Sequence, residues 1–215
     1  MLGREDQNDF VWGHVSVRDP EGRGIWMKAA SWGFDEIGPE QVILVSWDGE
    51  VVEGDGRRHI EYPIHTELMR ARDDVNCVVH THAGWATAFA STGEPLRPIS
   101  HEATLFVPPD VARFTKTGDL IRSAELGADL AAAVGDRNAA FMLHHGIVTC
   151  GESVSTGVMT AVLLERACRT AIRALAAGGP KSWSDDEEAL SKRSHCWSPQ
   201  LLGQAWDYLV RSLDR

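Results

Sequence analysis

Alternating apolar and polar positions dominate the first part of the chain. Residues 14–18 (HVSVR) alternate up to the turn sequence DPEGRG, and residues 24–28 (GIWMK) follow it, so together they predict a hairpin. Residues 42–47 (VILVSW), the turn DGE and the sequence VVEG predict a second hairpin. The run DVNCVVHTHAGW at 74–85 predicts a mostly buried strand that ends in two histidines.

Helical spacing takes over between and after these strands. Residues 61–72 place Ile64, Leu68 and Ala71 on one helical face, with Pro63 in the first turn. We predict further helices at 84–92, 119–134, 152–177 and 199–213, and a polar linker at 180–187. Apolar runs predict a strand at 104–107 and two short strands within 139–151. This mixture indicates an α/β sandwich with a mixed or mainly antiparallel sheet, not a doubly wound parallel one.

Composition narrows the class of protein. The chain has 215 residues, 43% hydrophobic and 24% charged, which fits one domain with a sizeable core. Its net charge of −10 argues against a general nucleic-acid binder, which needs a basic face. The sequence has no apolar run of about 18 residues, no signal-peptide pattern at its start and no C-x-x-C pair among its four cysteines. We therefore expect a cytoplasmic protein without a membrane span or a disulfide framework.

The histidines are the first candidates for chemistry. His80 and His82 lie two residues apart in a strand and so point to the same face. The sequence LHHG at 143–146 adds two more at the corner after another apolar run, and three histidines with an open position form a common catalytic metal site. Glu61 could serve as a further ligand or an acid/base, or could merely complement a helix N-terminus. His65, one turn later, is expected to orient a neighbour rather than bind the ion.

Four sequence blocks carry a resemblance to a known family. GHVSVRDPEG, EYPIHTELMRARDDVNCVVHTHAGWATAFA, GDRNAAFMLHHGIVTCG and the long helix after them resemble, in order, the class II aldolase/adducin family over roughly residues 10–178. The resemblance implies a three-layer α/β/α sandwich and a homotetramer with active sites between subunits. It also implies His80, His82 and His145 as metal ligands and Glu61 as the catalytic glutamate, with His144 where the family has asparagine.

The chain departs from the family where sugar-phosphate aldolases hold a phosphate. The Gly-Asn-x-Ser loop reads Gly13-His14-Val15-Ser16, and the two serines before the glutamate read His59-Ile60. The Ser-Gly turn corresponds to Ala30-Ser31 or to a shifted pairing in AASWG. Most of the donors that a phosphate dianion needs are therefore missing. Arg57 and Arg58 lie next to this region and could hold an anion in another way, or could simply be solvated.

The remaining pocket residues suit a flat, unphosphorylated carboxylate. We expect His14, Trp32 and His59 to bind it, with Trp12 nearby. This pattern resembles the family branch that includes metal-dependent decarboxylases of hydroxylated aromatic or pyridine carboxylates. We therefore expect a lyase that uses one divalent ion (Zn, Mn, Fe or Co) and a small-molecule carboxylate. The alternatives are an aldolase or epimerase on a small hydroxy-carbonyl compound, a ferrous oxygenase, and a non-catalytic adducin-like module.

The C-terminal part is expected to complete the domain. We predict a catalytic domain at 1–179, and a linker and C-terminal helix at 180–215 that cover the active site within the same domain. Tyr208 and Arg211 share a face of that helix, which makes them candidates for a catalytic acid and a carboxylate clamp. The alternative is a helix that only packs. Only about ten polar residues precede the first strand, where the family has a helix, so that helix is absent or the start lies upstream.

Overall fold

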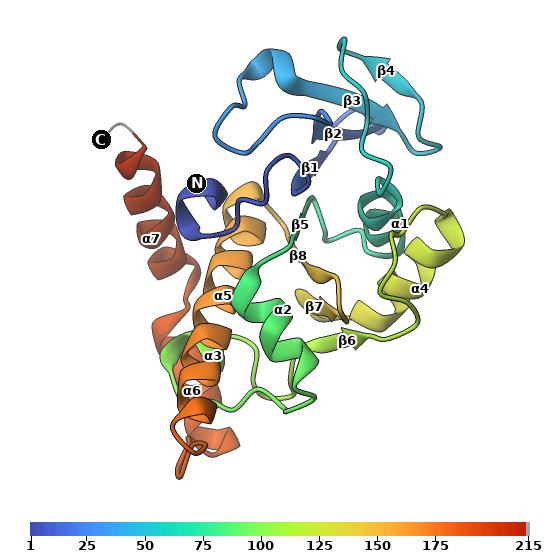
Figure 1. Ribbon diagram of the computed structural model, residues 1–215. Coiled ribbons are helices and arrows are strands. Elements are labelled where there is room, and N and C mark those ends of the chain that lie inside the picture. The colour runs from blue at the N-terminus through green and yellow to red at the C-terminus, as the bar shows by residue number, and fades with distance from the viewer. Residues whose placement is uncertain (214–215) are drawn as a thin grey trace.

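An eight-stranded sheet forms the centre of the protein, and the computed structural model describes residues 1–213. The strand order is β4-β3-β2-β1-β5-β8-β7-β6 (Figure 1). All neighbouring strands are antiparallel except β6 and β7, so the predicted mixed, mainly antiparallel sheet is confirmed. The strands are β1 (His14–Arg18), β2 (Gly24–Lys28), β3 (Val42–Ser46), β4 (Val51–Glu53), β5 (Cys77–Thr81), β6 (Ala112–Phe114), β7 (Ala139–Met142) and β8 (Gly146–Gly151).

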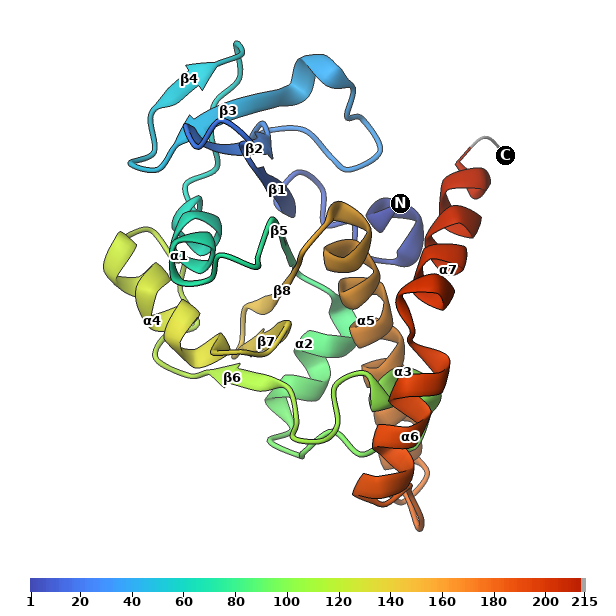
Figure 2. The ribbon, with the colours of Figure 1, turned by 180° about the vertical axis from the view of Figure 1, so that it is seen from behind.

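Helices cover both faces of the sheet and make three layers. One apolar core joins α2, α3, α5 and α7 to one face, and a second core joins α1 and α4 to the other. Figure 1 shows the sheet between α1 and α4 on the right and α5 and α7 on the left, and Figure 2 shows the same layers from behind. The helices are α1 (Pro63–Ala71), α2 (Gly84–Ser91), α3 (His101–Thr104), α4 (Ala124–Val134), α5 (Val154–Ala176), α6 (Asp186–Cys196) and α7 (Pro199–Ser212), with 3-10 turns η1 (Leu2–Glu5) and η2 (Pro39–Gln41).

Strand β5 lies near the middle of the sheet, and helices cover both of its faces. Cys77 and Val79 point into the core beneath α5, whereas Val78 points into the core beneath α1. All five residues of the strand are buried, which explains its nearly continuous apolar run. The alternation continues to His80, which therefore faces the α1 layer together with Val78.

The start of β8 lies unusually close to the end of β5. A Cβ atom at Gly146 would lie 2.4 Å from the carbonyl oxygen of Thr81 and 3.0 Å from the ring of His82. Only glycine allows this approach without a shift of the backbone. The His-His-Gly corner can thus bring His145 next to the two histidines of β5.

The strand predicted at 104–107 is wrong. Helix α3 ends at Thr104, and Ser100 caps its start by accepting a hydrogen bond from the Ala103 amide at 3.4 Å. Pro108 and Pro109 directly follow residues 104–107, and neither has the N–H that a strand needs for pairing. The edge strand is β6, a few residues later, paired in parallel with β7.

The C-terminal region contains a helix that its sequence pattern did not predict. Helix α6 begins inside the predicted linker, and Asp185 caps it by accepting from the Glu188 amide at 2.8 Å. The predicted helix at 199–213 is present as α7, with Ser198 as its cap. The predicted helix at 119–134 is shorter than expected, because Ser123 caps it and the helical turns start at Ala124. No helix within residues 1–213 is long and apolar enough to span a membrane.

Candidate metal centre

Four potential metal ligands converge where β5 ends, β8 begins and α1 starts. The ligand atoms of Glu61, His80, His82 and His145 all lie within 4.8 Å of one another. His80 is the fourth residue of β5, and His82 directly follows the strand. His145 comes from the corner between β7 and β8, and Glu61 lies two residues before α1. The structure thus brings together the three histidines and the glutamate that the sequence analysis selected.

The rings of His80 and His82 are oriented by hydrogen bonds from Nδ1, whereas Nδ1 of His145 has no partner within residues 1–213. His80 donates from Nδ1 to the carbonyl oxygen of Ile147 at 2.9 Å, and His82 donates from Nδ1 to Oδ2 of Asp9 at 2.6 Å. The Nε2 atoms of His80, His82 and His145 are buried and have no hydrogen-bond partner within residues 1–213. Buried polar atoms are rarely left without a partner, so three together call for a ligand that accepts their lone pairs. The donor set fits a divalent cation.

Glu61 faces these histidines as a carboxylate. Its Oε2 lies 3.8 Å from Nε2 of His80 and 3.6 Å from Nε2 of His145, while its Oε1 accepts the Ile121 amide at 2.8 Å. Burial alone would raise the pKa of Glu61, but His145, His80 and the Ile121 amide together lower it to about 2. Burial also lowers the pKa of His80 well below its usual value, so its ring is neutral. A negative carboxylate beside the neutral imidazole of His80 is the charge pattern of a cation site.

A second group of histidines lines the wall beside the cluster. The ring centroid of His14 lies 4.9 Å from that of His80 and 4.4 Å from that of His59. His14 Nδ1 shares a 2.6 Å hydrogen bond with His65 Nε2, and His65 Nδ1 shares a 2.7 Å bond with the hydroxyl of Ser16. Burial lowers the pKa of His14 well below its usual value, that of His59 to about 4 and that of His65 to about 3. The structure therefore places three buried, neutral imidazoles directly beside the metal cluster.

The remaining expected site residues lie further out. Trp32 is partly exposed, and its carbonyl accepts a hydrogen bond from the Lys28 ammonium. Arg57 is bonded to the Ser31 hydroxyl at 3.2 Å. Tyr208 is 61% exposed on α7, and Arg211 is also exposed there. Helix α7 packs on α5, on the opposite face of the sheet from α1, so one chain does not bring these two residues to its own cluster.

Asp9 is the site residue that the sequence analysis missed. It lies in the polar segment before β1, where no periodic pattern marks it, and it contacts His82 across 73 positions of sequence. The Ile121 amide was also missed, because a backbone donor carries no sequence signal. A carboxylate acceptor behind a metal-ligating histidine is a common arrangement, but its position in the chain varies with the fold.

Comparison with known proteins identifies the family to which the chain is similar. The family model described as "Class II Aldolase and Adducin N-terminal domain" matches residues 1–172. Decarboxylase NovR of Streptomyces niveus is 32% identical over 176 residues, which is 80% of this chain and 65% of that protein. The 3,4-dihydroxyphthalate decarboxylase of Rhodococcus jostii is 32% identical over 190 residues, 83% of this chain and 77% of that protein.

A solved structure shows the same architecture with a different activity in its name. The L-fuculose 1-phosphate aldolase from Glaciozyma antarctica superposes with a TM-score of 0.85 at 25% identity, over 99% of this chain and 84% of that one. Similar proteins thus include both decarboxylases and aldolases. The chain spans less than two thirds of the length of NovR.

Proposed function

Because the chain belongs to the class II aldolase and adducin family, we propose that it is a metal-dependent carbon–carbon lyase. We further propose that it decarboxylates a hydroxylated aromatic or heteroaromatic carboxylate. The observation that carries the proposal is the convergence of three unpartnered, buried imidazole nitrogens on the carboxylate of Glu61. A non-catalytic module of this fold has no need for such a set of unpaired ligands.

The proposed metal ligands are His80, His82 and His145, with Glu61 as a fourth group close by. A divalent ion held there would supply a Lewis acid that stabilises the negative charge developing on substrate oxygens. An ortho hydroxyl beside the substrate carboxylate offers two oxygens to such a site. Zinc, manganese, iron and cobalt all suit imidazole and carboxylate ligands.

The walls of the site support an aromatic substrate over a sugar phosphate. Neutral, buried His14 and His59 stand beside His80 where the family resemblance expects hydroxyl and amide donors. The Ser16 hydroxyl, which the family motif retains, is already bonded to His65. A flat ring can stack against imidazoles, whereas a phosphate dianion would find few free donors. We assign substrate contacts to His14 and His59, and to Trp32 at the exposed rim.

The proposed chemistry balances with one proton. The bond between the ring carbon and the carboxylate breaks, its electron pair stays on the ring carbon, and carbon dioxide leaves. Because Glu61 is ionised in the free protein, it would first take up a proton, from the ortho hydroxyl of the bound substrate or from a water, and then transfer it to the ring carbon to form the new C–H bond. The Ile121 amide fixes one oxygen of Glu61, so the other remains directed at the reacting position.

The C-terminal helix is proposed to act in an assembly. Tyr208 and Arg211 are exposed on α7, away from the cluster of their own chain. In a homotetramer with active sites between subunits, they would serve a neighbouring copy as acid and carboxylate clamp. Substitutions Tyr208→Phe and Arg211→Gln test this assignment, because each should lower turnover without changing the metal content of the protein.

The proposal is tested with purified full chain, stripped of metal and reloaded with Zn²⁺, Mn²⁺, Co²⁺ or anaerobic Fe²⁺. Hydroxylated benzoates, phthalates and pyridine carboxylates are screened for carbon dioxide release. We expect Glu61→Gln to abolish turnover while metal stays largely bound, and His82→Ala to lose the metal. Glu152→Gln, an exposed carboxylate, is the matched control. Full activity in Glu61→Gln, or unchanged metal content in His82→Ala, would contradict the assignments.

An aldolase is the second candidate, because a solved aldolase superposes over nearly the whole chain. It would use the same ligands and Glu61 to cleave a hydroxy-carbonyl compound. Aldehyde formation from such compounds, with no carbon dioxide from any carboxylate in the screen, would favour it. Oxygen consumption with Fe²⁺ would instead indicate an oxygenase.

A further inference from the structure

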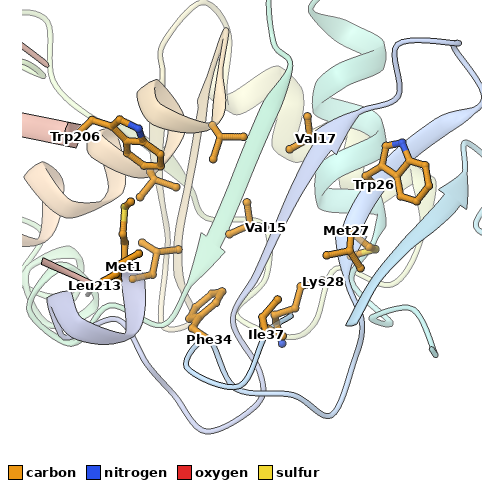
Figure 3. Close-up of a pocket in the computed structure, with 14 residues that line it drawn as sticks. Met1, Val15, Val17, Trp26, Met27, Lys28, Phe34, Ile37, Trp206 and Leu213 are labelled. Atoms are coloured by element: carbon orange, nitrogen blue, oxygen red, sulfur yellow. The ribbon is translucent and has the colours of Figure 1, made fainter. Parts of the chain in front are cut away.

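The first twelve residues, here called the N-terminal strap, run from α7 to the metal centre. The strap begins at an apolar groove of about 360 Å³ between the sheet and α7, where Met1, Trp206 and Leu213 line the same side (Figure 3). Arg4 donates hydrogen bonds to the carbonyl oxygens of Ser212 and Leu213 at the end of α7, and the bond to Leu213 is 2.9 Å long. One end of the strap is thus held by the C-terminal helix.

Further contacts hold the strap on both sides of Asp9. The Thr81 hydroxyl donates to the side-chain carbonyl of Gln7 at 2.7 Å, and both residues are buried. Beyond Asp9, the carbonyl of Val11 accepts from the Lys28 ammonium at 3.0 Å. These contacts keep the strap in place although it is not a strand of the sheet.

Asp9 connects the strap to a proposed metal ligand by a hydrogen bond. Its Oδ2 accepts from Nδ1 of His82 at 2.6 Å, which leaves the lone pair of that ring on Nε2, facing Glu61. His80 is oriented differently, by the Ile147 carbonyl within the sheet. The His82 side chain is 23% exposed and lies beyond the last residue of β5, so the sheet alone does not fix its ring.

We infer that Asp9 is a positioning residue for the metal centre, which holds His82 in the tautomer and orientation that binds the ion. The inference rests on the metal centre proposed above. A carboxylate acceptor on the far ring nitrogen also makes the coordinating nitrogen more basic. Because Asp9 is carried by the strap, metal affinity depends on a segment that Arg4 ties to α7.

The competing explanation is a partly exposed ion pair that does not affect metal binding. Surface pairs of this kind contribute little, and their removal would leave the ion bound equally well. The two explanations differ in metal affinity and in the state of the His82 ring, not in the fold.

The test uses purified full chain and Zn²⁺ alone, with affinity measured by competition against a chromophoric chelator. Asp9→Ala should weaken Zn²⁺ binding roughly 10- to 100-fold. Asp9→Asn keeps an oxygen acceptor without the charge and should show a smaller loss. Asp35→Ala, which removes a carboxylate bonded to Asn8 of the strap, is the matched control and should leave affinity unchanged.

A second readout reports on the His82 ring without metal. Long-range ¹H–¹⁵N spectra of metal-free protein should show Nδ1-protonated His82 in the wild type and a shift from this form in Asp9→Ala. The signals are assigned by comparison with His82→Gln. Thermal unfolding of the metal-free variants should be nearly unchanged, which separates positioning from a folding role.

Each outcome decides between the explanations. Equal Zn²⁺ affinity in wild type and Asp9→Ala would overturn the role of Asp9 while leaving the metal centre intact. Equal losses in Asp9→Ala and Asp35→Ala would also overturn it, because the strap as a whole would then be responsible. A wild-type protein that binds no divalent ion would overturn the metal centre, and the inference with it.

Discussion

The carboxylate of Glu165 allows a test of how α5 stabilises α2, the helix that follows the proposed metal ligands on β5. Glu165 lies on α5, is 4% exposed, and accepts the backbone amides of Trp85 at 2.9 Å and Ala86 at 2.8 Å. These amides belong to the first turn of α2, whose own cap residue, Ala83, has no side-chain acceptor. Helix α5 thus caps α2 two residues after the proposed ligand His82.

The expected cost of Glu165→Ala follows from these two bonds. Hydrogen bonds to a charged group contribute about 1.5–3 kcal/mol each, so two set an upper limit of about 3–6 kcal/mol. Removal of a buried charge relieves its desolvation, which offsets part of this loss. We expect the free energy of unfolding to fall by roughly 2–3 kcal/mol, or about 5–10 °C in Tm for a chain of this size. Glu165→Gln keeps one carbonyl acceptor and should lose about half as much.

The assay is thermal unfolding of metal-free protein, followed by circular dichroism, with Glu152→Gln as the exposed control. Burial raises the pKa of Glu165, and the two amides partly oppose that rise. The folded carboxyl therefore binds a proton more readily than the unfolded one. Its contribution to stability must fall as pH rises above the ordinary value of 4.5, and Glu165→Gln should remove this slope. A Tm within about 2 °C of wild type in Glu165→Ala would refute the capping argument.

Three further outcomes are expected. Burial lowers the pKa of Lys28 from 10.5 to about 8. The free energy of unfolding of the wild type should therefore rise by about 2–3 kcal/mol relative to that of Lys28→Met between pH 7 and 10.5. Denaturant titrations measure this difference, and a difference that stays constant with pH would contradict the prediction. Gly146→Ala places a methyl group against the Thr81 carbonyl and should lower both Tm and Zn²⁺ affinity. Wild-type values for both would show that the backbone between β7 and β8 moves to make room for the methyl group. One thiol per chain, that of half-buried Cys196, should react quickly with a thiol reagent. Burial raises the pKa of the other three cysteines (Cys77, Cys150, Cys168), so their thiols should react slowly. A second fast-reacting thiol would contradict the burial of these three side chains.

Local spacing predicted that the two histidines near the end of β5 lie together, whereas the choice of His145 and Glu61 came from the family resemblance. The two histidines at the end of β5 share a face because strand residues alternate, and the LHHG corner must lie where two neighbouring strands meet. Contacts that depend on tertiary packing left no such signal. Asp9 and the Ile121 amide reach the site from irregular segments, and their positions depend on how the strap and the loop before α4 pack.

The secondary-structure errors have equally specific causes. Residues 105–107 are apolar because they pack in the core beneath α5, not because they pair in the sheet, and the prolines after them lack the N–H that pairing needs. Helix α6 buries only Ala189, so its sequence carries almost no apolar periodicity. The sequence signals for this helix were its cap Asp185 and the acidic residues of its first turn. They were missed because these polar residues were assigned to the predicted linker.

The chain of bonds from Ser16 through His65 to His14 strengthens the argument about substrate class. Ser16 matches the family's phosphate-loop serine, yet its hydroxyl is bonded to His65 at 2.7 Å, and His65 is bonded in turn to His14 at 2.6 Å. All three side chains are buried, and burial lowers the pKa of both imidazoles, so none of them brings a positive charge to the pocket. A dianion placed there would lose its hydration and gain no positive charge from these three side chains, which is costly in a buried site. A planar ring would lose little hydration, and its carboxylate could still be held at the ion site. The wall beside the proposed metal centre therefore supports the proposed aromatic carboxylate as substrate, and Ser16 is not evidence for a phosphate.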